Sequence, residues 1–219
     1  MSGMEKIKEI FETYLMTLVH PFRIHQQFRH QLPLPSQDGH LYRPLTLAEG
    51  LGVSWIFVIL RGLGKIIIMV AFLNFFMSLQ SPEFPFLQDL IRSSSITAYS
   101  FLLFSAALDI IFFPIGAIIM TEFWAWVIRT YSGWLNPDQD ADTIADQITV
   151  HALSSNLFSM IPILGDLIQP ILYYFLLYAG IRSNLGATRS LTFIVLITPT
   201  LLIGMFLSVM ALAIFYLVT

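Results

Sequence analysis

The sequence predicts an all-α integral membrane protein, a polytopic bundle of about five transmembrane helices preceded by an amphipathic helix at the membrane interface. Two observations on composition indicate this class. Hydrophobic residues make up 56% of the chain and charged residues only 11%, and the mean hydropathy of +0.74 is far above that of soluble domains. The third observation is a series of apolar stretches after residue 50, each longer than the roughly 20 residues that one crossing requires.

Residues 1–46 are predicted to lie at the membrane surface. Between residues 4 and 19, apolar side chains recur at helical spacing with charged side chains on the other side, which is typical of an interfacial helix. The polar segment that follows contains prolines and predicts a non-spanning linker. Three histidines at its start, five residues apart, would be scattered around a helix, so we expect them to face solvent or headgroups, with metal binding or pH sensing as the alternative. They are His20, His25 and His30.

Residues 47–219 are predicted to be the transmembrane domain. Residues 51–79 form its first crossing, and residues 96–120 form its second, continuing as a helix through residue 135. An acidic loop follows, with a composition before Ile144 that is typical of a helix start. Residues 148–181 are too long for one crossing and are interrupted, so we interpret them as two helices. Residues 191–218 form the last crossing.

The basic residues support an orientation with the amino terminus in the cytoplasm. With five crossings, eight lysines and arginines fall in cytosolic segments, whereas the outer segments hold only Arg92. Lysine and arginine are enriched in the cytosolic loops of membrane proteins. The carboxyl terminus is then expected to end on the outer side.

Three charges fall inside the first two predicted crossings. Arg61 lies about 15 Å along the first and Asp109 about 16 Å from the cytosolic end of the second. We therefore expect Arg61 to pair with Asp109 near the bilayer centre, with Lys65 one turn further along the same face. Alternatively, a crossing that begins at Gly62 would leave both cations near its cytosolic end, where they would snorkel to the headgroups.

A row of polar residues follows one face of the third predicted crossing. Its members recur every fourth residue, with two more beside them: Gln147, His151, Ser155 and Ser159, then Ser154 and Asn156. Such a face is expected to look inward. It would either join helices by hydrogen bonds or line a path for a polar solute.

The interruption after this row is the predicted helix-break turn. It contains Pro162, Gly165, Asp166 and Pro170. A turn between two spans is the simpler interpretation. A broken helix that aims its dipole ends at a ligand, as in transporters, is the alternative.

Several function classes are disfavoured by the sequence. The chain has no cysteine, which excludes disulfides, thiolate metal sites and cysteine nucleophiles. It has no H-E-x-x-H, G-x-S-x-G, P-loop or G-x-G-x-x-G motif. It also has no basic block for nucleic acid. We therefore expect a non-enzymatic protein without a cofactor, a metal or a nucleic-acid partner.

Residues 123–202 resemble the Yip domain, the family of Ypt-interacting membrane proteins. The shared order is a helix ending near a glycine, a helix running into a Pro-x-x-Gly break, a span ending in Gly-Ile-Arg, and a last span. In this chain these marks are Gly133, then Pro162 with Gly165, and "GIR" at 180–182.

The resemblance implies five spans and, in eukaryotic relatives, association with prenylated Rab-type small GTPases and with one another. Those relatives carry a longer amino-terminal region with an aspartate-leucine-tyrosine-glycine-proline motif. This chain lacks the motif, so it resembles a bacterial member and no GTPase-binding residue is assigned. The implied location is the bacterial inner membrane.

Two functional hypotheses follow. In the first, the protein is a membrane-organising scaffold that assembles with itself or with other membrane proteins in the lipid bilayer, and its polar residues join helices. In the second, it is a channel or transporter for an ion or small polar solute, and the intramembrane charges line the path.

Overall fold

The computed structural model describes residues 3–30, 42–78, 85–135, 140–161 and 164–218, and all regular elements in these ranges are helical. The elements in chain order are α1 (Gly3–Val19), α2 (Pro21–His30), α3 (Leu47–Ser78), α4 (Pro85–Leu135), α5 (Ala141–Ala152), the 3-10 helix η1 (Leu153–Met160), α6 (Leu164–Ser183) and α7 (Arg189–Val218). The predicted all-α fold class is confirmed. The second predicted crossing is indeed one helix that continues to residue 135.

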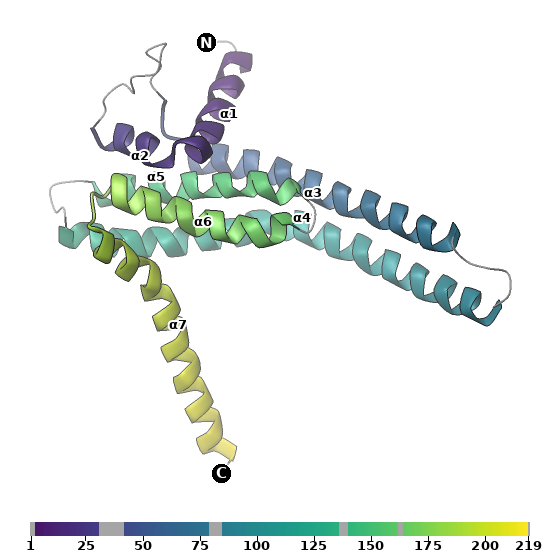
Figure 1. Cartoon of the computed structure of the whole chain (residues 1–219). Coiled ribbons are helices and arrows are strands. Elements are labelled where there is room, and N and C mark those ends of the chain that lie inside the picture. The colour runs from purple at the N-terminus through teal and green to yellow at the C-terminus, as the bar shows by residue number, and fades with distance from the viewer. Residues whose placement is uncertain (1–2, 31–41, 79–84, 136–139, 162–163, 219) are drawn as a thin grey trace.

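A bundle of helices forms the centre of the molecule (Figure 1). In it α5, η1 and α6 pack against one half of the antiparallel α3–α4 pair. Its core is apolar and includes the fully buried side chains of Trp124, Ile128, Ile148 and Leu177. Gly62 brings α3 close to α4, because a Cβ atom built there would lie only 3.0 Å from Ile110 Cδ1.

Local capping explains where two of the bundle helices begin. The Thr46 N–H donates to Glu49 Oε2 at 3.0 Å, and the Glu49 N–H donates to Thr46 Oγ1 at 3.3 Å. This reciprocal pair is a capping box at the start of α3. At the start of α5, Asp140 Oδ1 accepts a hydrogen bond from the Asp142 N–H at 3.1 Å, so the predicted helix start in the acidic segment is confirmed.

Four helices in the described residues are long and apolar enough to span a membrane, in place of the five predicted. They are Leu47–Phe72, Leu103–Leu135, Leu164–Ser183 and Arg189–Tyr216. The predicted third crossing is not one apolar helix, because α5 ends at Ala152 and continues as the 3-10 helix η1. Together α5 and η1 still carry the chain along the bundle for about 30 Å, as far as α6 runs back.

Two apolar arms leave this bundle (Figure 1). The halves of α3 and α4 farthest from α5 and α6 project together beyond it. The other arm is α7, which departs from the opposite end and contacts α6 and α4 only near its start. Every residue of α7 from 201 to 216 is exposed in the single chain.

The amino-terminal helices α1 and α2 cover the bundle on one side (Figure 1). The predicted amphipathic helix is confirmed as α1, whose Tyr14 is buried while Met4 and Ile7 remain exposed. The predicted linker is wrong for residues 21–30, which form the helix α2 against α6. Ile24 and His25 of α2 are fully buried against the bundle. This packing stabilises a helix that the composition of the segment did not indicate.

Candidate functional site

The charge cluster within the bundle differs from the one predicted. Arg61 Nη2 lies 2.6 Å from Asp166 Oδ1, and Lys65 Nζ lies 3.0 Å from Asp166 Oδ2. Asp166 sits in the first turn of α6, where the helix dipole also favours a negative charge. The expected Arg61–Asp109 pair is therefore wrong, because the tip of the α5–α6 hairpin brings a carboxylate to the same cations.

Asp109 itself lies on the surface of α4. Its side chain is exposed, and no ion pair joins it to another residue in the described part of the chain. The residues of α4 that face Gly62 of α3 are the neighbouring Ile110 and, almost one turn earlier, Ala106. Asp109 thus lies beside the α3–α4 contact and not within it.

The predicted helix-break turn is present between η1 and α6. Ile161 is extended, and the Gly165 N–H donates to the Ile161 carbonyl at 2.7 Å. Gly165 is buried and packs closely on the end of η1. A Cβ atom there would lie 2.9 Å from Ser159 Cα and still closer to the Phe158 carbonyl oxygen, so only glycine fits without a shift of the backbone. Pro170 lies inside α6 and does not end it, and Pro162 is outside the described residues.

The polar row is buried, as expected for an inward face, apart from the half-buried Gln147. One of its members, Asn156, shares a backbone acceptor with donors from two other helices. The Leu153 carbonyl oxygen accepts hydrogen bonds from Tyr14 Oη at 2.7 Å, Ser54 Oγ at 3.2 Å and Asn156 Nδ2 at 2.9 Å. These donors come from α1, α3 and η1. Three elements are therefore joined at the point where the α-helix changes into a 3-10 helix.

Other residues of the row are also hydrogen-bonded within the protein, except Ser154, whose buried Oγ has no hydrogen-bond partner in the described residues. Asn184 Nδ2 donates to Gln147 Oε1 at 2.9 Å, and Ser159 Oγ donates to the Asn156 carbonyl at 2.6 Å. Gln169 Nε2 of α6 reaches Asn156 Oδ1 at 3.3 Å and Ser155 Oγ at 3.4 Å. The row connects α5 and η1 to α6 and to the segment after it.

A buried pair of imidazoles lies where α2 meets the bundle. The rings of His25 and His151 are 5.7 Å apart, and both side chains are fully buried. His151 Nδ1 lies 2.7 Å from the Gln147 carbonyl, and its Nε2 accepts a long hydrogen bond from the Leu45 N–H. Neither His25 nitrogen has a hydrogen-bond partner in the described residues. The expectation that His25 faces solvent or headgroups is wrong, whereas His20 and His30 are exposed.

Burial lowers the pKa of both imidazoles. The pKa of His25 lies well below its usual value, first because of desolvation and second because of repulsion by His151. Desolvation lowers the pKa of His151 to about 4, partly opposed by its hydrogen bond to the Gln147 carbonyl. Both rings are therefore neutral at pH 7.

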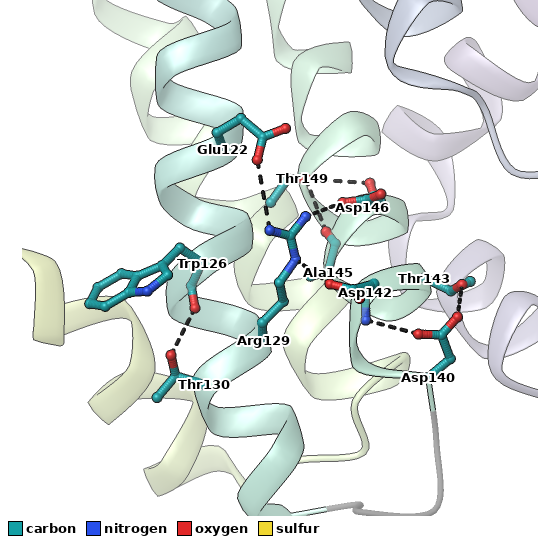
Figure 2. A network of polar contacts seen from close by, with 10 residues as sticks. All are labelled: Glu122, Trp126, Arg129, Thr130, Asp140, Asp142, Thr143, Ala145, Asp146 and Thr149. Carbon is teal, nitrogen blue, oxygen red and sulfur yellow. Dashed lines mark hydrogen bonds and ion pairs between the residues drawn. The ribbon is translucent and has the colours of Figure 1, made fainter.

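A third cluster, with the charged Arg129 at its centre, joins α4 to α5 at the end of the bundle away from Asp166 (Figure 2). Arg129 of α4 points between three carboxylates, with Nε 2.8 Å from Asp142, Nη2 3.0 Å from Asp146 and Nη1 3.8 Å from Glu122. The Asp142 and Asp146 side chains are 77% and 60% exposed. Such exposed pairs contribute roughly 0 to 1 kcal/mol each. The network therefore orients α5 more than it stabilises the fold.

Sequence reasoning missed the partners in these clusters. The lone Arg129 just before an acidic segment was a signal for the third cluster. Tyr14 and His25 gave no comparable signal, because Leu153 and His151, which they contact, lie more than 100 residues away in the chain. Their burial depends on how α1 and α2 dock.

The described residues contain no group of three or more histidine, aspartate or glutamate side chains that could hold a metal ion. The chain matches no protein-family model, no curated protein and no solved structure. The clusters above must therefore be interpreted from their own chemistry.

Proposed function

We propose that the protein is a non-enzymatic membrane scaffold that assembles with copies of itself in the bilayer. The observation that carries the proposal is the contrast between its interior and its arms. Most of the buried polar row is engaged in internal hydrogen bonds. By contrast, residues 201–216 of α7 are all exposed in the single chain, and they are apolar apart from the hydroxyl groups of Ser208 and Tyr216.

The internal bonds favour joining helices over lining a path. A solute path needs polar groups that are free to exchange partners with the solute. Here Asp166 neutralises one of two neighbouring cations, and Asn156 bonds both to Leu153 and to Gln169. Hydrogen bonds of this kind hold membrane helices together.

The exposed arms supply surface for assembly. Apolar side chains such as Phe206 on α7 and Phe104 on α4 are more than half exposed in the single chain. Lipid can cover such surfaces, and van der Waals packing against another helix can replace lipid at little cost. Gly204 faces open space on α7 and would allow close approach of a second helix.

The proposal includes the orientation of the chain in the membrane. The amino terminus lies in the cytoplasm, with the apolar row of α1 on the inner leaflet of a bacterial inner membrane. The Yip-domain resemblance agrees with a five-pass chain path and with self-association, and the proposal assigns no GTPase partner.

Disulfide crosslinking in native membranes tests the proposal, because the chain is free of cysteine. Phe206→Cys or Phe104→Cys is expected to give a disulfide-linked dimer under mild oxidation, whereas Lys8→Cys, on an exposed position of α1, should not. A protein that stays monomeric with every arm position tested would contradict the proposal.

Flux in proteoliposomes separates the scaffold from a channel or transporter. We expect no ion or small-solute flux above empty liposomes, either for the native protein or for Asp166→Asn. A flux that the native protein supports and Asp166→Asn abolishes, with Asp109→Asn as the matched control, would replace the scaffold by a transport function.

A further inference from the structure

A cavity lies where α2, the start of α5 and the segment after α6 meet. Its volume is about 230 Å³, which exceeds the roughly 150 Å³ of a cavity that holds one benzene molecule. Phe28 and Arg29 of α2 line it, together with Asn184 after α6 and several residues at the start of α5. The cavity therefore has room for a small polar group.

The start of α5 presents one face to this cavity. Its four lining residues follow the spacing i, i+3, i+4 and i+7, which places them on one side of a helix: Asp140, Thr143, Ile144 and Gln147. The Thr143 hydroxyl donates a hydrogen bond to Asp140 Oδ2. In Figure 2 these two side chains lie away from Arg129, whereas Asp142 and Asp146 turn toward it. The Asp140 carboxylate is therefore on the cavity side of the helix.

Arg29 brings a positive charge to the same cavity. Its side chain is exposed, and it makes no hydrogen bond or ion pair within the described part of the chain. The guanidinium lies against Gly186, where a Cβ atom would overlap it. Gly186 also has a φ of 71°, which favours glycine. The chain thus leaves space for this guanidinium beside the cavity and leaves its donors free for an anion.

Gln147 adds a neutral donor group. Its Oε1 accepts a hydrogen bond from Asn184 Nδ2 at 2.9 Å. Its Nε2 has no hydrogen-bond partner among the residues that the structure describes. The amide is therefore held with its oxygen engaged and its N–H groups available.

The cavity lies at the level where a crossing meets the membrane surface. One candidate span ends at Ser183 and another begins at Arg189, so Asn184 falls in the short segment between two crossings. A third candidate span ends at Leu135, shortly before Asp140. Segments just outside a crossing lie among the lipid headgroups. The ligand that the cavity meets there is a headgroup.

We propose that this cavity binds the headgroup of a zwitterionic phospholipid that has a phosphate and a primary ammonium group, as phosphatidylethanolamine has. Arg29 pairs with the phosphate, because a guanidinium matches phosphate oxygens, and Gln147 donates a further hydrogen bond to it. Asp140 accepts hydrogen bonds from the ammonium group, which has three N–H donors. This inference is independent of the scaffold proposal, since binding a lipid does not require self-assembly.

The test is native mass spectrometry of the full-length protein released from detergent micelles. Phosphatidylethanolamine, phosphatidylcholine and phosphatidylglycerol with identical acyl chains are titrated in turn to give dissociation constants. Phosphatidylethanolamine should bind most tightly, because choline has no N–H donor and the glycerol headgroup has no positive charge. Arg29→Gln is expected to raise the Kd for phosphatidylethanolamine about threefold to fivefold, the usual range for a partly exposed charge pair.

Asp140→Asn separates recognition of the ammonium group from the stability of α5. Asparagine caps a helix as well as aspartate does, so the start of α5 is preserved. The variant should bind phosphatidylethanolamine more weakly and phosphatidylglycerol more tightly than the native protein. Arg23→Gln on α2 and Asp142→Asn on α5 are the matched controls, because neither residue lines the cavity. Their dissociation constants for phosphatidylethanolamine should equal that of the native protein.

Three results would overturn the inference. The first is no preference of the native protein for phosphatidylethanolamine over the other two lipids. The second is an equal effect of each cavity variant and its control, which would mean that the charges act only through the general field of the surface. The third is equally tight binding of glycerophosphoethanolamine, the soluble headgroup without acyl chains, which would assign the cavity to a soluble phosphodiester.

Discussion

At the scale of single residues, the neutral His25–His151 pair makes the docking of α2 depend on pH. The group that faces His25 from α5 is His151, α6 presents the uncharged Gly180, and α2 itself contributes Phe28. Each histidine binds a proton less readily in the folded chain than in the unfolded chain. The unfolded state therefore takes up more protons on acidification, and the free energy of unfolding falls as the pH drops below about 6.5.

The expected loss is large enough to measure. For His151, whose pKa falls to about 4, linkage predicts a loss on the order of 2 kcal/mol between pH 7.5 and pH 5. His25→Leu should reduce the total loss, whereas His20→Gln, at an exposed position, should not. Unfolding in detergent followed by circular dichroism at several pH values measures this. If both variants lost the same unfolding free energy on acidification, His25 would not contribute to the pH dependence.

A second residue-scale feature is a side-chain donor that replaces a missing backbone donor. Pro114 inside α4 has no N–H, so the Ile110 carbonyl lacks its usual helical partner. Trp55 Nε1 of α3 donates to that carbonyl at 2.8 Å. The proline therefore leaves a free carbonyl on α4, and the indole N–H of Trp55 on α3 binds it.

Substitution of Trp55 by Phe is expected to lower the free energy of unfolding by about 1 kcal/mol. Pro114→Ala restores the N–H, so the same Trp55 substitution should have a smaller effect in that background. A double-mutant cycle of unfolding free energies measures the coupling. Additive effects would mean that the indole contributes through packing alone.

At the scale of elements, the α5–η1–α6 hairpin depends on a close backbone approach. Gly165 at its tip lies against the Phe158 carbonyl and Ser159 Cα. These are backbone atoms, which cannot rotate away as a side chain can. The turn also holds Asp166 beside Arg61 and Lys65, so its geometry sets the charge cluster.

Gly165→Ala should therefore lower the free energy of unfolding by about 1 to 3 kcal/mol, the usual effect of overpacking. Gly204→Ala is the matched control, because a Cβ atom there meets nothing within 4 Å. It should be neutral or slightly stabilising, since alanine favours a helix. Equal stabilities of the two variants in detergent would show that the turn can relax.

At the scale of the whole molecule, the chain path brings distant segments to one end of the bundle. Arg29 of α2 lies against Gly186, just after α6, and Asn184 bonds to Gln147 in the middle of α5. The hairpin thus returns to the end from which it started. The segment after α6 and the helix α2 should lie on the same side of the membrane.

Cysteine labelling tests this arrangement. Arg23→Cys and Thr188→Cys occupy exposed positions and should react with a membrane-impermeant maleimide from the same side of sealed inverted vesicles. Both should be protected in intact cells. Labelling of the two cysteines from opposite sides would mean that α5 and η1 do not carry the chain across with α6.

By itself the sequence determined the helical membrane class, the amphipathic α1, the continuous α4, the start of α5 and the break before α6. Each of these follows from hydropathy, helical spacing or capping, which are local properties of a segment. The predicted inward face of the polar row also followed from spacing, because residues four apart share one side of a helix.

Only the tertiary structure decided which groups meet. Arg61 pairs with Asp166 and not with Asp109, His25 is buried against His151, and the third crossing divides into α5 and η1. The choice of partner depends on the depth and rotation at which helices dock. Close contacts between distant segments, such as those at Gly62 and Gly180, set that depth, and no local pattern records them.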